Sequence, residues 1–135
     1  TALDELLSVA DIVSIHMPLN PASRGFFNWE LFRQCKPGMC LVNTSRGALV
    51  DSPSLERALA CDLVSGAYLD VIDSEPTPST TLRADPRVVL TPHAAFYSER
   101  SLYDLRSSAT SALYDLLTHG RTPNLLNKEL YASEI

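Results

Sequence analysis

Short runs of apolar residues recur along the chain, separated by polar residues, glycine or proline. The four clearest runs occupy residues 11–15, 40–43, 67–71 and 88–90. Each run is rich in Val, Ile and Leu and is continuous, as in strands that are covered on both faces. The pattern therefore predicts four buried strands.

Stretches with helical spacing lie between these runs. One surrounds residues 29–34, another begins at Asp51 or Ser52 as N-cap, and the chain opens with leucines at positions 3, 6 and 7. Strands that alternate with helices indicate an α/β fold with a parallel sheet and right-handed crossovers. The prolines within residues 75–78 predict a loop passing over the sheet, because proline does not allow an immediate helix there.

The longest periodic segment follows residue 97. Ser98 is its expected N-cap and Gly120 its expected C-terminal stop. We expect this amphipathic helix to close the fold with its apolar face. The residues of that face are Leu102, Leu105, Ala109, Ala112, Leu113 and Leu116.

Composition and charge exclude several classes of protein. The chain has 135 residues, of which 45% are hydrophobic, so it is long enough for one domain with one core. The net charge is -5 and its basic residues are scattered, which argues against direct binding of nucleic acid. No apolar run could span a bilayer and no signal region is present, so we expect no membrane contact and a cytoplasmic location. Three cysteines without CxxC spacing argue against disulfides and against a metal site.

Residues capable of acid-base chemistry follow the predicted strands. His16 follows the first strand, Arg46 the second, Asp70 and Glu75 the third, and His93 the fourth. In an open parallel sheet the carboxyl ends of the strands share one edge, where ligands bind. We therefore expect these residues to converge. An arginine, two acids and a histidine match a demand for carboxylate binding together with proton transfer.

Three stretches make the pattern more specific, namely VNTSRGALVD at 42–51, YLDVIDSEP at 68–76 and TPHAAFYSE at 91–99. Together with the HMPL turn at 16–19, they resemble, in the right order, the NAD-binding domain of the D-isomer-specific 2-hydroxyacid dehydrogenase family. Residues 92–99 most resemble the branch that includes the C-terminal-binding protein co-repressors and their dehydrogenase relatives. The resemblance implies the C-terminal half of a Rossmann-type sheet over residues 1–127, with the first βαβ unit missing, and an irregular tail at 128–135.

The resemblance also implies roles for individual residues. Arg46 corresponds to the arginine that holds the carboxylate and 2-oxo group of a small 2-oxo or D-2-hydroxy acid. His93 corresponds to the general acid/base, and Glu75 to the carboxylate that pairs with this histidine. Asp70 corresponds to the acid that faces the nicotinamide end of NAD. The residues that match positions lining the cofactor are His16, Pro18, Thr44, Ser45, Arg46, Asp70, His93 and Ala95.

Each of these residues also has a simpler interpretation. Taken alone, Arg46 is an ordinary loop arginine, Glu75 belongs to a solvated turn, and His93 either caps the following helix or fills a polar pocket. The spacing between them is compatible with the family and favours catalysis. For His16, a strand-end histidine bonded to backbone is about as probable as a cofactor contact.

The sequence departs from the family in one major respect, because none of its five glycines forms the G-x-G-x-x-G motif that binds pyrophosphate. The first residue is Thr1, so we expect either a longer parent protein or pairing with a second copy or with the missing half. Preference for NAD over NADP is a family default only, and the usual alanine before the arginine is Ser45. The alternatives to a dehydrogenase are an NAD(H)-sensing regulatory or co-repressor-like protein and an inactive fragment.

Overall fold

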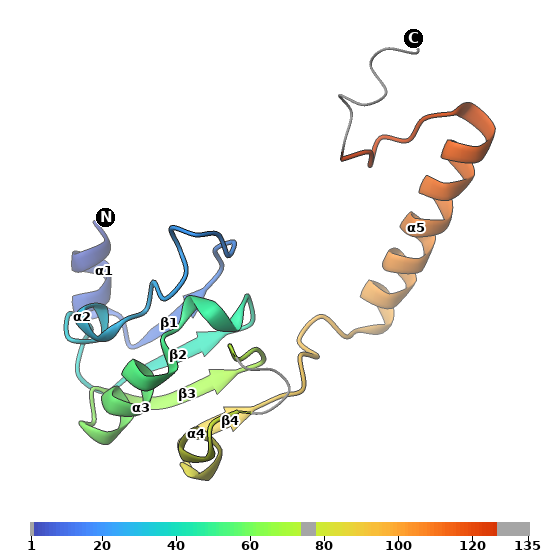
Figure 1. Cartoon of the computed structure of the whole chain (residues 1–135). Helices are drawn as coiled ribbons and strands as arrows, with labels where there is room; N and C mark the ends of the chain where they lie inside the picture. Colours follow the sequence, from blue (N-terminus) through green and yellow to red (C-terminus); the bar gives the residue numbers. More distant parts are fainter. Residues whose placement is uncertain (1, 74–77, 127–135) are drawn as a thin grey trace. The chain divides into compact units, whose positions relative to one another are not determined.

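The computed structural model of the chain describes residues 2–73 and 78–126 (Figure 1). Contacts between residues divide the chain into two compact units, Thr1–Ala95 and Phe96–Ile135. Each unit is described by itself below. The first holds a parallel sheet with short helices, and the second holds one long helix.

The first unit alternates helices and strands. The sheet is parallel throughout, with the strand order β1-β2-β3-β4. The predicted α/β fold is therefore confirmed, although β3 begins three residues before and ends two residues before its predicted bounds. In chain order the elements are α1 (Leu3–Val9), β1 (Ile12–Ile15), α2 (Trp29–Phe32), β2 (Met39–Asn43), the 3-10 helix η1 (Gly47–Leu49), α3 (Ser52–Ala60), β3 (Val64–Leu69), α4 (Thr80–Ala84) and β4 (Val88–Leu90).

The core lies between the sheet and the helices of the first unit. Leu7 of α1, Phe32 of α2 and Leu55 of α3 are fully buried against strand residues such as Leu41. Helix α3 forms here because the Asp51 side chain accepts a hydrogen bond from the Ser54 amide, and a proline stands in its first turn. Burial of each such leucine contributes about 2 kcal/mol.

Within the first unit taken by itself, the described strands are covered on one face, and the predicted cover of the second face is not found in this unit. Burial alternates along β1 and β2. The outward side chains of Ile12 in β1, Tyr68 in β3 and Val89 in β4 are 67%, 47% and 47% exposed. Helices α1, α2 and α3 pack on the other face (Figure 1). An apolar side chain shows that a position tolerates burial, but it does not show that a covering layer is present.

Helix α4 was not predicted from the sequence. It has five residues, and the Ser79 side chain caps it by accepting a hydrogen bond from the Leu82 amide. Leu82 is the residue of this helix that is buried in the core. A single turn with one apolar contact is too short to show helical periodicity, which explains why the pattern missed it.

Helix α5 (Glu99–His119) makes up most of the described part of the second unit. Ser98 caps it through a capping box, and Gly120 ends it in the left-handed conformation with φ of 67°, as predicted. The expectation that α5 closes the fold with its apolar face stays a prediction. Helical periodicity shows that one face is apolar, but it does not show what covers that face.

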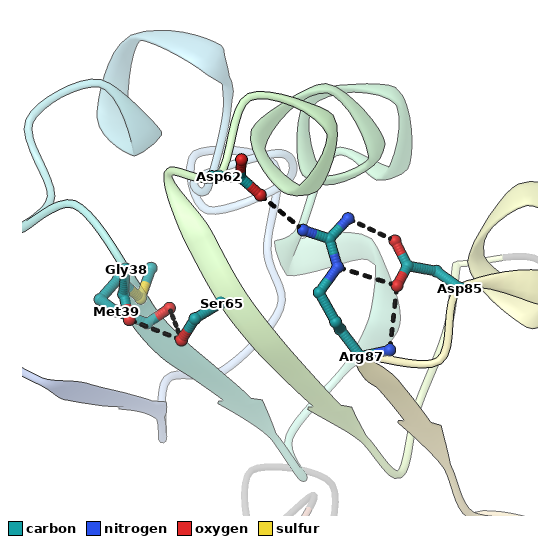
Figure 2. A network of polar contacts seen from close by, with 6 residues as sticks. All are labelled: Gly38, Met39, Asp62, Ser65, Asp85 and Arg87. Carbon is teal, nitrogen blue, oxygen red and sulfur yellow. Dashed lines mark hydrogen bonds and ion pairs between the residues drawn. The ribbon is translucent and has the colours of Figure 1, made fainter.

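The amino-terminal edge of the sheet carries a network of polar contacts (Figure 2). The Arg87 guanidinium donates to the Asp85 carboxylate at 3.0 and 2.7 Å and to Asp62 at 2.9 Å. These bonds from Arg87 lower the pKa of Asp85 to about 2. Beside them, the Ser65 hydroxyl donates to the Gly38 carbonyl at 2.6 Å. The turn before β2 is thereby bonded to β3, and the turns before β3 and β4 are bonded to one another.

Candidate active site

A pocket of about 350 Å³ lies at the carboxyl-terminal edge of the sheet, where β3 and β4 end. Asp70 and Ile72 line it from the segment after β3, and Thr91 and His93 line it from the segment after β4. Two of the residues predicted to converge, Asp70 and His93, therefore share this pocket. The polar groups come from loops, and the parallel strands fix where those loops begin.

Asp70 is a buried acid whose hydrogen bonds hold the neighbouring loop. Asp70 is only 6% exposed. Its carboxylate accepts hydrogen bonds from the backbone amides of Ala94 and Ala95, each at 2.8 Å. The Thr91 hydroxyl donates to the same carboxylate. Burial raises the pKa of Asp70, but the hydrogen bonds from Thr91, Ala95 and Ala94 outweigh it, so the pKa lies below its ordinary value. Asp70 is therefore ionised at neutral pH.

His93 occupies a backbone conformation that few residues other than glycine adopt. Its φ is 54°, in the left-handed region, and its amide donates to the Asp70 carbonyl at 3.0 Å. Such a residue costs about 1–3 kcal/mol, so the surrounding contacts must hold it in place. The side chain is exposed and lines the pocket, which gives the imidazole access to a ligand.

Arg46 follows β2 on a turn that Asn43 holds. Asn43 is 1% exposed, its amide group donates to the Arg46 carbonyl at 2.9 Å, and its side-chain oxygen accepts from the Ser45 amide at 3.0 Å. The Ser45 hydroxyl donates to the Met17 carbonyl at 2.7 Å, which joins this turn to the end of β1. The Arg46 guanidinium is exposed and donates to the Ser45 carbonyl at 2.7 Å.

Gly47 brings the arginine turn against the wall of the pocket. A Cβ at this position would lie 1.9 Å from the backbone carbon of Ile72, which is far inside contact distance. Only a residue without a Cβ allows this approach. Arg46 itself is not among the described residues that line the pocket, but the next residue, Gly47, approaches Ile72 of the pocket wall.

The remaining predicted cofactor residues lie at the ends of β1 and β2. His16 is exposed, and its Nε2 atom lies 2.8 Å from the Ser14 hydroxyl, so its partner is a side chain and not the backbone. The Pro18 carbonyl accepts from the Ser23 hydroxyl at 2.8 Å, and Thr44 is exposed. Contact of these residues with a cofactor stays a prediction.

Glu75 lies outside the described residues. Its predicted pairing with His93 therefore stays a prediction. Within residues 2–73 and 78–126, no group of three His, Cys, Asp or Glu side chains is arranged to hold a metal ion. In the same part of the chain, no helix is long and apolar enough to cross a membrane.

Two residues that shape the site had no role in the sequence analysis. Asn43 holds the arginine turn, and Gly47 permits its close approach to Ile72. The signal for Asn43 was a polar residue at the end of an apolar strand, since such a residue must find hydrogen-bond partners when buried. Gly47 gave no such signal, because a close approach involves a segment distant in sequence.

Comparison with known proteins places this site in a family. Residues 1–95 match the family described as "D-isomer specific 2-hydroxyacid dehydrogenase, NAD binding domain". The chain belongs to this family. Membership confirms the resemblance inferred from the three stretches around Arg46, Asp70 and His93. It also accounts for the parallel sheet, because the solved structures similar to this chain include dehydrogenases of this family.

Individual relatives match nearly the whole chain. It is 37% identical over 134 residues to C-terminal-binding protein 1 of Caenorhabditis elegans, covering 94% of this chain and 18% of that protein. It is 38% identical over 131 residues to a glyoxylate reductase of Thermofilum pendens, covering 96% of this chain and 39% of the relative. The chain thus spans well under half of the length of either curated relative.

A solved structure is similar to this chain in both sequence and fold. The NAD-complexed form of a D-isomer specific 2-hydroxyacid dehydrogenase from Lactobacillus delbrueckii ssp. bulgaricus is 31% identical and superposes with a TM-score of 0.86. The match covers 94% of this chain and 43% of that one. Here too this chain spans less than half of the length of the protein it is similar to.

Proposed function

We propose that this chain supplies the substrate-binding arginine and the acid-base histidine of an NAD-dependent dehydrogenase that interconverts a small 2-oxo acid and its D-2-hydroxy acid. The observation that carries the proposal is the pocket at the carboxyl-terminal edge, over which a strained turn presents His93. Arg46 stands on the adjoining turn, pressed against Ile72 by the Gly47 contact. An imidazole and a guanidinium at one sheet edge suit a substrate with a carboxylate beside a carbonyl.

The pocket fits one end of a dinucleotide. A cavity of about 350 Å³ lies at the small end of the range for ligand pockets and suits a ring-sized group such as nicotinamide. Leu69 and Leu90 give the pocket apolar walls, and His93 gives it a polar group. The chain itself contains no glycine-rich pyrophosphate motif. When bound, NADH supplies the hydride for C2 of the substrate.

The residues of this chain supply the proton and the orientation. In the reducing direction the His93 imidazole donates a proton to the 2-oxo oxygen, and in the oxidising direction it accepts one from the hydroxyl. Histidine is the side chain that most often serves as general acid and general base in enzymes. The planar Arg46 guanidinium binds the substrate carboxylate with paired hydrogen bonds. We propose that Glu75, from the segment after β3, orients His93 and favours its protonated form.

A chimaeric enzyme provides the test. In it, this chain replaces the matching 39% of the Thermofilum pendens relative, and NADH oxidation is followed with glyoxylate, pyruvate and hydroxypyruvate. We expect NADH oxidation, and we expect His93→Ala to lower kcat by about 10²–10⁴-fold. The control is His119→Ala, a histidine at the end of α5 whose side chain is 60% exposed, which should leave the rate unchanged.

Each outcome decides between functions. Undiminished turnover of the His93→Ala chimaera would remove the proposed acid-base role. Tight NADH binding without turnover of any of the three acids would instead favour an NAD(H)-sensing regulatory protein. The similarity to the Caenorhabditis elegans C-terminal-binding protein 1 is the reason to test this alternative. Binding is measured by the change in NADH fluorescence.

A further inference from the structure

We propose that Asp70 is a positioning residue, whose carboxylate holds the turn at residues 91–95 in the left-handed conformation that presents His93 to the pocket. The structural part of this inference stands by itself. Its meaning for catalysis rests on the proposed function, in which His93 transfers the proton.

The contacts of Asp70 reach both ends of the turn. One carboxylate oxygen accepts from the Ala94 amide at 2.8 Å and from the Thr91 hydroxyl, and the other accepts from the Ala95 amide at 2.8 Å. The Asp70 main-chain carbonyl accepts from the His93 amide at 3.0 Å. A single residue of the neighbouring strand end therefore binds four of the five residues of the turn.

The turn needs such a partner because its backbone is strained. His93 is one of two described residues other than glycine with positive φ, and the other, Asp62, lies in the polar network at the opposite edge. Two consecutive amides, those of Ala94 and Ala95, converge on one carboxylate. A charged acceptor makes stronger hydrogen bonds than a neutral one and so holds a conformation that the chain would otherwise leave.

The turn uses most of the hydrogen-bonding capacity of Asp70. An ionised carboxylate offers about four lone-pair positions, and three are taken by Thr91, Ala94 and Ala95. About one position is left for any ligand in the pocket. Substitution of Asp70 should therefore act mainly by moving His93 and only in smaller part by removing a ligand contact.

The unsubstituted 135-residue chain gives the first test, by NMR. We expect scalar couplings across the hydrogen bonds from the amide nitrogens of Ala94 and Ala95 to the Asp70 carboxyl carbon. We also expect the strong intraresidue amide-to-Hα Overhauser effect that marks positive φ at His93. On acidification, the chemical shifts of the Ala94 and Ala95 amide protons should change over the same pH range as the chemical shift of the Asp70 carboxyl carbon. Amide protons that stay constant while Asp70 titrates would overturn the proposal.

Variants give the second test. Asp70→Asn keeps the shape of the side chain but replaces one acceptor oxygen with a donor, so the coupling to one of the two amides should be lost. The Overhauser signature of His93 should weaken, with the shift changes concentrated in residues 91–95. The control is Asp73→Asn, which removes the same charge from an acid that is 52% exposed and paired with Arg24. This control should leave the turn unchanged.

The NMR tests of the positioning role and the activity assay of the chimaera can fail independently of one another. A His93 signature that survives Asp70→Asn, or that Asp73→Asn disturbs equally, contradicts the positioning role whatever the chimaera does. If Asp70→Asn fails to fold, the couplings and the titration of the unsubstituted chain still decide. Conversely, intact couplings combined with undiminished turnover of His93→Ala would remove the proposed catalysis and leave the positioning role standing.

Discussion

The two edges of the sheet use charged residues in opposite ways. At the amino-terminal edge, the Arg87 guanidinium forms ion pairs with the carboxylates of Asp85 and Asp62 (Figure 2). At the carboxyl-terminal edge, the Asp70 carboxylate is bound by backbone amides and a hydroxyl. The difference shows two ways to satisfy a carboxylate. An arginine neutralises Asp85, whereas two backbone amides and the Thr91 hydroxyl bind Asp70 and so hold the turn that carries His93.

The comparison predicts that the carboxyl-terminal edge tolerates backbone change poorly, and Gly47→Ala should have the largest effect. The added Cβ would lie 1.9 Å from the Ile72 backbone, so the arginine turn or the segment after β3 must move. We expect a loss of about 3 kcal/mol in the free energy of unfolding. Urea denaturation followed by circular dichroism measures it.

Gly66→Ala is the matched control for this substitution. Gly66 lies in β3, and its added Cβ would have ordinary contacts of 3.5–3.7 Å with Tyr68, Arg87 and Cys40. The effect should be within about 1 kcal/mol and can be stabilising, because alanine lowers the entropy of the unfolded chain. Equal effects of the two substitutions would contradict the tight approach at Gly47.

A smaller effect is expected from Ser45→Ala, which removes the hydrogen bond between the arginine turn and the Met17 carbonyl. The loss should be about 1 kcal/mol, the usual contribution of one such bond. The control Ser8→Ala removes a hydroxyl that bonds within the exposed surface of α1, and it should cost less. If both variants unfold at the same urea concentration as the unsubstituted chain, the Ser45 bond does not hold the turn.

The smallest effect is expected at the amino-terminal edge, where the ion pairs are partly exposed. The folded pKa of Asp85 is about 2, below the unfolded value of about 3.9. Its contribution is therefore complete above about pH 4 and is lost as the pH falls towards 2. Between pH 5 and pH 2.5, the urea midpoint of the unsubstituted chain should fall further than that of Asp85→Asn. An equal fall would show that the network does not stabilise this edge.

The sequence predicted what depends on local pattern and on the geometry of parallel sheets. Ser98 and Gly120 mark the ends of α5 as expected, and the rule that parallel strands share a carboxyl edge brought Asp70 and His93 to one pocket. It could not predict the layer that covers a strand, because Tyr68 and Leu69 are both apolar and only one is buried.

The finer construction of the site also escaped prediction. The positive φ of His93 and the close approach of Gly47 to Ile72 both arise between segments distant in sequence. The sequence therefore indicated candidate groups for the site, and tertiary contacts determine how those groups are held.

The central claim is that Arg46 and His93 act together at the carboxyl-terminal edge of the sheet. A crystal structure of the chimaeric enzyme with NADH and oxamate, an unreactive analogue of pyruvate, tests it most directly. The account predicts the oxamate carboxylate within about 2.7–3.2 Å of the Arg46 guanidinium and its carbonyl oxygen at a similar distance from the His93 imidazole. Oxamate bound elsewhere, or the two side chains facing away from one another, would contradict it.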